Sequence, residues 1–232
     1  GASWEGGSME QLEILPYLQR QGIQLEWLIL SHDDNDHSGG ARAILSAYPD
    51  IQLTTASQKR YGEKNTAEND RTFCLAGKQW TWQGLRFTVL SPNNIVPRAE
   101  NPDSCTLLLT DGKYNILLTG DADLSVEYNI LPKLDKIHVL QVGHHGSKTS
   151  TGEALVRHTQ PDIALISSGR WNPWHFPNNE VMARLKQQGT QRYNTAETGQ
   201  ISLLFDENKI EIQTARAEFS PWYRRLIGLK GK

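Results

Sequence analysis

The sequence predicts an α/β fold, and three observations support this class. Segments rich in β-forming residues alternate with segments of helical apolar periodicity along the 232 residues. No long linker or low-complexity stretch separates them. Asp and His residues gather at the ends of several expected strands. A chain of this length forms one large domain or two small ones, and the continuous alternation favours one.

The first half of the chain predicts two helices, one buried strand and a hairpin. Residues 9–21 have a helical pattern, in which Pro16 marks either the true helix start or a kink. The apolar run 24–30 indicates a buried strand, and residues 39–47 indicate the helix after it. Residues 79–90 predict a hairpin that turns near Gln83-Gly84.

The second half predicts more strands. The segments 104–110 and 114–118 form a hairpin through Asp111-Gly112, a pair that suits the positive φ angles of a tight turn. Two short apolar strands follow at 137–142 and 162–167. Residues 177–188 form a helix capped by Asn178 or Asn179 and ended by Gly189. A last hairpin joins 200–205 to 209–213.

Composition excludes several classes of protein. A net charge of −2 argues against a strongly basic nucleic-acid-coating protein, although it does not exclude a local basic patch. No apolar run approaches the roughly 18 residues that span a bilayer, and no secretory leader is visible. Two cysteines are too few for a disulfide framework, but they are enough to form one disulfide bridge. We expect a domain at 1–214 and a basic tail at 215–232, both excised from a longer chain.

The stretch SHDDNDHSGG at residues 31–40 carries the strongest functional signal. It crowds His32, Asp33, Asp34, Asp36 and His37 at the end of a buried strand. Like charges this close repel one another unless a positive group lies among them. A polar turn followed by a helix cap is the plainer interpretation, but this density of ligand residues favours a metal site.

Similar clusters follow three other expected strands. Thr119-Gly120-Asp121, Gly143-His144-His145-Gly146-Ser147 and Ser168-Gly169 with Asn172 and His175 each come directly after a strand. Each cluster alone is more often a turn or a loop. Strands of one sheet can bring their ends together along one edge, so we expect the four clusters to converge on one polar cleft.

The motif His32-x-Asp34-x-Asp36-His37 resembles the first metal motif of the metallo-β-lactamase fold, His-x-His-x-Asp-His, with Asp34 in place of the second His. The stretches SHDDNDHSGG, LLTGD, VGHHGSKTS and NPWHFPNNEVMARLKQQG together resemble the C-terminal domain of ComEC-type DNA-internalisation competence proteins, over residues 3 to about 205. This resemblance implies an αββα sandwich. The opening strands of that fold, with their Asp-x-Gly motif, are expected to be truncated here.

The resemblance also implies two divalent metal ions. His32 and Asp34 would hold the first ion, and Asp36, His37 and His145 or His144 the second, with a slight preference for His145. Asp121 would bridge the two. The third motif of the family falls at 101–104, where Asp103 is the ligand candidate and Asn101 and Ser104 are alternatives.

The residue types fit this chemistry. Side chains at i and i+2 of an extended stretch point the same way, so His32 and Asp34 can clasp one ion. Asp34 in place of His makes the site richer in oxygen, which makes Mn²⁺ plausible beside Zn²⁺. The lack of Cys ligands argues against a closed structural zinc site. Paired metals activate water and clamp the oxygens of a phosphate.

Groups suited to a phosphodiester surround the expected ligands. Ser147, Lys148 and Thr149 are the predicted phosphate-binding residues, against the plainer interpretation of Lys148 as a solvated loop residue. His175 lies among Trp171, Trp174 and Phe176 and would protonate the leaving oxygen or stack near a base, unless it sits in a buried aromatic corner. The predicted catalytic residues are Asp36, Asp121 and His175.

Three functions fit these observations. The resemblance favours a metal-dependent DNase that degrades the non-imported strand during transformation. The alternatives are a hydrolase of small phosphodiesters or lactones and a non-catalytic DNA-holding domain. The resemblance implies DNA, the membrane channel part of the parent chain and other competence proteins as partners. It places the parent in the bacterial inner membrane, with this soluble domain on the periplasmic side.

Overall fold

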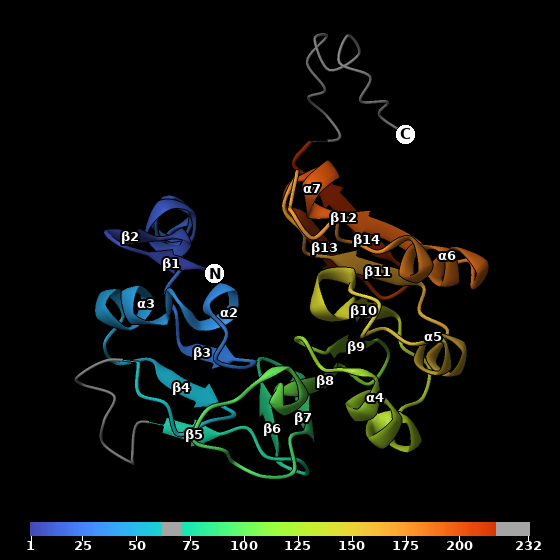
Figure 1. Cartoon of the computed structure of the whole chain (residues 1–232), viewed down its shortest axis with the longest axis horizontal. Helices are drawn as coiled ribbons and strands as arrows, with labels where there is room; N and C mark the ends of the chain where they lie inside the picture. Colours follow the sequence, from blue (N-terminus) through green and yellow to red (C-terminus); the bar gives the residue numbers. More distant parts are fainter. Residues whose placement is uncertain (62–70, 217–232) are drawn as a thin grey trace, which may run out of the picture.

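The computed structural model describes residues 1–61 and 71–216 of the chain and confirms the α/β class (Figure 1). Its largest element is a seven-stranded sheet with the order β12-β11-β10-β9-β8-β7-β6. The strands are β6 (Gln79–Trp82), β7 (Leu85–Ser91), β8 (Thr106–Thr110), β9 (Asn115–Leu118), β10 (Val139–Gln141), β11 (Ile163–Ile166) and β12 (Gln191–Asn194). Neighbours from β6 to β9 are antiparallel, and those from β9 to β12 are parallel. The loops after β9, β10 and β11 therefore leave the sheet at one edge.

A second, parallel sheet contains β3 (Trp27–Leu30), β4 (Gln52–Thr55) and β5 (Arg71–Phe73). The expectation that the strand before the SHDDNDH stretch shares a sheet with the others is wrong, because β3 pairs with β4 and belongs to this smaller sheet. Its end still meets the ends of the other strands, since the two sheets pack face to face.

Two small hairpins complete the strands, β1 (Ser3–Trp4) with β2 (Gly7–Ser8) and β13 (Ile201–Phe205) with β14 (Ile210–Thr214). The helices are short. They are η1 (Glu10–Ile14), α1 (Leu15–Gln21), α2 (Asn35–Ser38), α3 (Ala41–Ala47), η2 (Asn101–Asp103), α4 (Leu124–Ile130), η3 (Leu131–Lys133), η4 (Gly143–Gly146), α5 (Glu153–Thr159), α6 (Asn179–Gln187) and α7 (Thr195–Thr198). Within the described ranges, none of them is both long and apolar enough to cross a bilayer.

Three of the four apolar clusters in the described residues show the layers most clearly. One lies between the sheets and includes Phe87, Val89 and Leu107 with Ile29 of β3 packed against it. A second joins the seven-stranded sheet to α4 and α5 through residues such as Leu117, Ile130 and Leu155. A third joins the small sheet to α3 and includes Leu53 and Ile44. Helices thus cover the outer face of each sheet, which confirms the expected αββα sandwich (Figure 1).

The two cysteines form one disulfide between the layers. Cys74 follows β5 of the small sheet and Cys105 precedes β8 of the large sheet, with their Cα atoms 5.8 Å apart. The bridge closes a sequence separation of 31 residues. By the chain-entropy argument, a loop of that size stabilises the folded state by about 3–4 kcal/mol.

Most predicted elements are present with shifted ends. Gln83 and Gly84 both have positive φ (47° and 82°), so the first hairpin turns where expected. Asn178 is the cap of α6, because its side chain accepts a hydrogen bond from the Glu180 amide. Pro16 lies in the first turn of α1, but the helical backbone already begins at Glu10 in the π-helix η1, so the interpretation of Pro16 as the start of the helix is wrong. The expected helix at 39–47 is shorter, since α3 begins only at Ala41 and a separate turn of helix, α2, lies within the SHDDNDH stretch.

Residues 217–232 of the expected basic tail lie outside the described residues. At its start, the Arg216 guanidinium donates to the carbonyl oxygens of Ala196 (2.9 Å) and Thr195 (3.4 Å).

Candidate metal centre

The SHDDNDH stretch turns directly from β3 into α2. Asp34 is the N-cap residue of α2, with extended backbone angles (φ −64°, ψ 150°), but its side chain makes no capping hydrogen bond. Its carboxylate instead lies 3.6 Å from Nε2 of His32 and 3.7 Å from the Arg98 guanidinium. The plainer interpretation of this stretch as a helix cap therefore does not account for Asp34.

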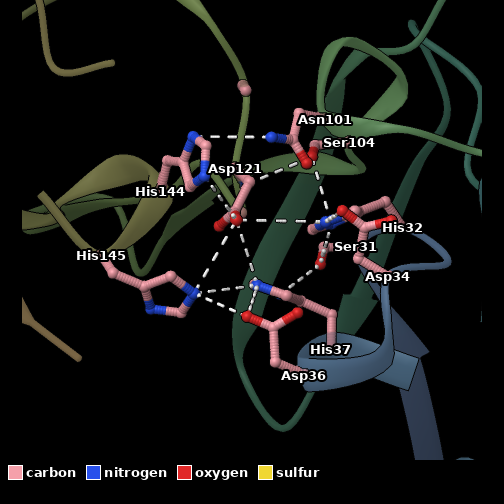
Figure 2. Close-up of polar contacts among 12 residues, drawn as sticks. Ser31, His32, Asp34, Asp36, His37, Asn101, Ser104, Asp121, His144 and His145 are labelled. Atoms are coloured by element: carbon pink, nitrogen blue, oxygen red, sulfur yellow. Dashed lines mark hydrogen bonds and ion pairs between the residues drawn. The ribbon is translucent and has the colours of Figure 1, made fainter. Parts of the chain in front are cut away.

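Asp121 lies at the centre of four imidazole rings (Figure 2). One of its carboxylate oxygens, Oδ2, is within 4.0 Å of the Nε2 atoms of all four, at 3.2, 3.8, 3.9 and 4.0 Å for His37, His145, His144 and His32. The approach of β9 to β3 depends on Gly120 (φ 56°), where a Cβ atom would come within 2.8 Å of the Ser31 Cβ. The strand ends could not meet this closely around a larger residue.

A second group overlaps the first. Nε2 of His145 lies 3.1 Å from Asp36 Oδ2 and 3.2 Å from Nε2 of His37. His37 therefore belongs to two sets of potential ligands, one with His32 and Asp121 and one with Asp36 and His145. The described residues thus form two overlapping donor sets, and Asp34, predicted to hold the first ion with His32, belongs to neither of them.

Hydrogen bonds behind the rings fix their orientation. Nδ1 of His145 donates to the Ser167 carbonyl oxygen (2.7 Å), which directs Nε2 into the cluster. The Ser31 hydroxyl bonds to Nδ1 of both His32 (3.1 Å) and His37 (3.2 Å). Such contacts to the outer nitrogen are typical of metal-binding histidines, because they set the ring orientation and tautomer.

Two atoms inside the cluster lack partners. Nε2 of His32 and Oδ1 of Asp121 are fully buried and make no hydrogen bond. A buried polar atom without a partner costs about 1–3 kcal/mol, and more when it is charged. Ligand atoms about 2.0–2.2 Å from one ion lie roughly 3–4 Å from each other, which is the spacing of this cluster. The donor set therefore fits divalent metal.

The charges also favour a cation. A hydrogen bond from His145 lowers the pKa of Asp36 well below its usual range, against the effect of burial. The pKa of Asp121 is lowered too, because the hydrogen bond from His37 and the nearby rings outweigh a large opposing effect of burial. Burial, and then His37, lowers the pKa of His32, so that this ring stays neutral and free to bind metal. The bond to Asp36 raises the pKa of His145 to about 8.

The 101–104 segment brings the two alternative candidates, Asn101 and Ser104, to the cluster rather than the first candidate, Asp103. Asp103 belongs to neither donor set, and its carboxylate accepts from the Glu100 amide (3.1 Å) in the capping box of η2. Its neighbours reach the cluster instead. The Asn101 side chain lies 3.5 Å from Nδ1 of His144, and the Ser104 hydroxyl accepts from the Asp121 amide (3.2 Å).

The predicted phosphate-binding loop adjoins the cluster. Thr149 Oγ1 lies 3.2 Å from Nδ1 of His144 and 2.9 Å from the hydroxyl of the buried Ser147. Lys148 and His175 are exposed. His175 precedes Phe176, whose ring packs against His144 with centroids 5.8 Å apart. The strand end at Ser168-Gly169 supplies no ligand to either donor set, but the Ser167 carbonyl next to it orients His145.

Asp33 has a role that the sequence does not reveal. The residue is 2% exposed and belongs to neither donor set. It accepts hydrogen bonds from the Ala99 amide (2.7 Å), the Ser57 hydroxyl (3.0 Å) and the Tyr61 hydroxyl. The carboxylate thus ties the backbone between His32 and Asp34 to two distant segments. These partners lie 24 to 66 residues away, so no local sequence pattern identifies them.

Comparisons with known proteins agree with this geometry. The family model of the metallo-β-lactamase superfamily matches residues 1–170. The chain is 59% identical to Recombination protein 2 of Haemophilus influenzae over 99% of its own length. It is 32% identical to ComE operon protein 3 of Bacillus subtilis over 84% of its length, and 29% identical to Competence protein ComA of Neisseria gonorrhoeae over 93%.

The chain spans only part of these relatives, 28%, 26% and 30% of their respective lengths. Among solved structures, CmlA, a diiron β-hydroxylase from Streptomyces venezuelae, superposes with a TM-score of 0.50 at 7% identity, over 82% of this chain and 47% of that one. That likeness concerns the fold alone. The matches confirm the predicted resemblance to ComEC-type competence proteins, and the chain belongs to the metallo-β-lactamase superfamily.

Proposed function

We propose that this chain is a metal-dependent phosphodiesterase that cleaves DNA and that two divalent ions, Mn²⁺ or Zn²⁺, occupy its cluster. The pair of overlapping donor sets around His37 and Asp121 carries the proposal, together with the unpartnered buried atoms of His32 and Asp121. Metallo-β-lactamase proteins are generally metal-dependent hydrolases, and their metals are commonly zinc or iron. When bound, such ions supply Lewis-acid chemistry and activate water.

The side chains divide into ligands and substrate-binding groups. His32 and Asp34 would hold one ion and Asp36, His37 and His145 the other, with Asp121 shared between them. His144 belongs to neither donor set, and its Nδ1 is hydrogen-bonded to Thr149, so we assign it to the substrate side. The hydroxyl of Thr149 and the ammonium of Lys148 bind phosphate oxygens. His175 donates a proton to the leaving oxygen as the phosphodiester bond breaks.

The names of the relatives support DNA as the substrate, since they refer to recombination and competence. We propose that the chain is the nuclease domain of a DNA-uptake channel and degrades the strand that is not imported. Its partners would then be DNA, the membrane part of the same parent chain and other competence proteins. The parent would lie in the bacterial inner membrane, with this domain on the periplasmic side.

Hydrolysis of defined substrates tests the proposal. Protein loaded with Mn²⁺ or Zn²⁺ is incubated with labelled DNA of several sequences, in single- and double-stranded form, beside small phosphodiesters and lactones. We expect cleavage of DNA without sequence preference, because the metal cluster and the loops beside it would contact the phosphate backbone rather than the base edges. Turnover of the small molecules alone would replace the nuclease by a small-molecule hydrolase. Binding of DNA without any turnover would mean that the chain is a non-catalytic DNA-holding domain.

A further inference from the structure

The loop between β11 and α6 holds exposed aromatic side chains beside the metal cluster. Trp171 is 88% exposed and Trp174 is 71% exposed. Water contact with such large apolar rings is unfavourable, and apolar surface of this kind next to a site marks a place where something binds.

Hydrogen bonds hold this loop in one shape. The Asn172 side chain donates to the carbonyl oxygens of Gly169 (2.9 Å) and Phe176 (2.8 Å) and accepts from the Phe176 amide (2.8 Å). The Asn178 amide then donates to the Gly146 carbonyl oxygen (2.8 Å), which ties the loop to the turn that carries His144. The exposed rings therefore sit on a fixed support, and a ligand would not have to order them on binding.

Three rings form a row that leads from solvent to the cluster. We call Trp174, Phe176 and His144 the aromatic row. The rings of Trp174 and Phe176 are nearly parallel, 17° apart with centroids at 6.4 Å, and Phe176 meets His144 at 5.8 Å. Nε2 of His144 lies 3.9 Å from the Asp121 carboxylate. A flat group stacked on the row would thus lie beside the place where a phosphodiester is cut.

We propose that the aromatic row and Trp171 bind unpaired nucleobases, so that the domain acts on single-stranded DNA or on frayed ends. This inference rests on the proposed function, which it deepens by naming the form of the substrate. In a duplex the base faces are covered by neighbouring pairs, whereas an unpaired base can stack on an exposed ring. Stacking accepts any base, in keeping with cleavage that ignores sequence.

Positive groups belong to the same two loops as the aromatic rings. The Arg170 guanidinium is 5.5 Å from the centroid of the Trp171 ring, and the exposed Lys148 belongs to the same loop as His144. A ring beside a cation is the combination that binds bases and backbone together in single-strand-binding proteins.

Binding without hydrolysis tests the row directly. Wild-type protein in excess EDTA is titrated with fluorescently labelled oligothymidylate and with an abasic strand of equal length. We expect tighter binding of oligothymidylate. Trp174→Ala and Trp171→Ala should each weaken that binding about tenfold and leave the abasic strand unaffected. Trp174→Phe should retain most of the affinity, and Tyr128→Ala, which removes an exposed ring from α4, should change nothing.

Hydrolysis with Mn²⁺ separates this inference from the proposed function. If the wild type cleaves DNA but both tryptophan variants bind and cleave oligothymidylate normally, the base-binding role is wrong and the nuclease stands. If the wild type cleaves no DNA, the nuclease is wrong. The EDTA titration then still decides whether the rings bind bases. Equal binding of the oligothymidylate and abasic strands by the wild type would overturn the inference in either case.

Discussion

The Tyr61 hydroxyl donates a hydrogen bond to the carboxylate of Asp33, and both side chains are buried. Asp33 stands between the proposed ligands His32 and Asp34, so this bond links the shape of the metal-binding turn to a segment 28 residues away. Burial, and then this bond, raises the pKa of Tyr61 to about 12. The phenol therefore stays protonated, and able to donate, at neutral pH.

We expect Tyr61→Phe to lower the free energy of unfolding by about 1–3 kcal/mol, the cost of removing a donor from a buried, charged acceptor. The change should also weaken Zn²⁺ binding, because the turn that carries His32 and Asp34 loses one of its anchors. Urea unfolding of metal-free protein and a Zn²⁺ titration measure the two effects.

Tyr48→Phe is the matched control for this substitution. Its hydroxyl donates to the Ile23 carbonyl at the exposed surface (3.3 Å), so we expect a change below about 0.5 kcal/mol and unaltered Zn²⁺ affinity. If the two variants lost equal stability, the Ser57 hydroxyl and the Ala99 amide would be sufficient partners for Asp33.

The chain should bind two divalent ions when it is loaded with Mn²⁺ or Zn²⁺, because the cluster contains two overlapping donor sets. Elemental analysis after removal of excess metal gives the stoichiometry. Asp121→Asn should reduce the occupancy of both positions, since its carboxylate borders both sets. Saturation at one ion per chain would contradict the two-metal arrangement.

Asp36→Ala should abolish hydrolysis and leave the fold intact. The Asp36 side chain is 55% exposed, so its removal opens no cavity in the core, but it takes away the carboxylate that pairs with His145. Circular dichroism and melting curves check the fold. Asp50→Ala, a change of an exposed carboxylate after α3, should retain full activity. Wild-type turnover by Asp36→Ala would remove Asp36 from the mechanism.

Lys148→Ala and His175→Ala should impair substrate use while metal content stays at the wild-type level, since both side chains are exposed and neither belongs to a donor set. For His175→Ala we expect a loss of about 10–100-fold in turnover if it protonates the leaving oxygen. Steady-state kinetics and elemental analysis of the same samples test this. Unchanged kinetics would make both residues ordinary surface positions.

The sequence predicts those parts of the site that depend on local spacing. Asp121, His144 and His145 each follow an apolar strand directly, so their arrival at one edge follows from the parallel pairing of β9 and β10. Orientation within a short turn is not predictable in the same way. Asp33 and Asp34 are adjacent carboxylates, and only distant partners decide that one turns inward and the other toward the rings.

Long-range pairing limits the prediction of the fold for the same reason. The hairpins at Gln83-Gly84 and Asp111-Gly112 follow from turn chemistry. In contrast, apolar periodicity predicts that residues 24–30 form a strand but does not show which strand it pairs with. The pairing of β3 with β4 in the small sheet therefore could not be predicted. In the 101–104 segment the sequence left three candidates open, and the capping box of η2 holds the carboxylate of Asp103 while Asn101 and Ser104 contact the cluster.

Glu127 provides a test of stability against pH. Its carboxylate is 3% exposed and accepts from the amides of Thr151 and Gly152, which follow the predicted phosphate-binding loop. Burial raises its pKa to about 7, from 4.5 for the free side chain, although the two amides oppose the change. The folded protein therefore holds this proton more tightly than the unfolded chain does. The resulting stabilisation is fully present below pH 4.5 and is lost as pH rises to about 7.

We accordingly expect metal-free wild-type protein to lose up to roughly 3 kcal/mol of unfolding free energy through this group between pH 4.5 and 7. Glu127→Gln keeps the shape without the titration, so the difference between wild type and variant should move by that amount across the interval. The comparison cancels other groups that titrate nearby, including His145, whose raised pKa also costs stability as pH rises toward 8. Urea unfolding in EDTA at half-unit steps of pH gives the difference. Parallel curves for the two proteins would show that the two amide bonds fully compensate for burial and that Glu127 is ionised throughout.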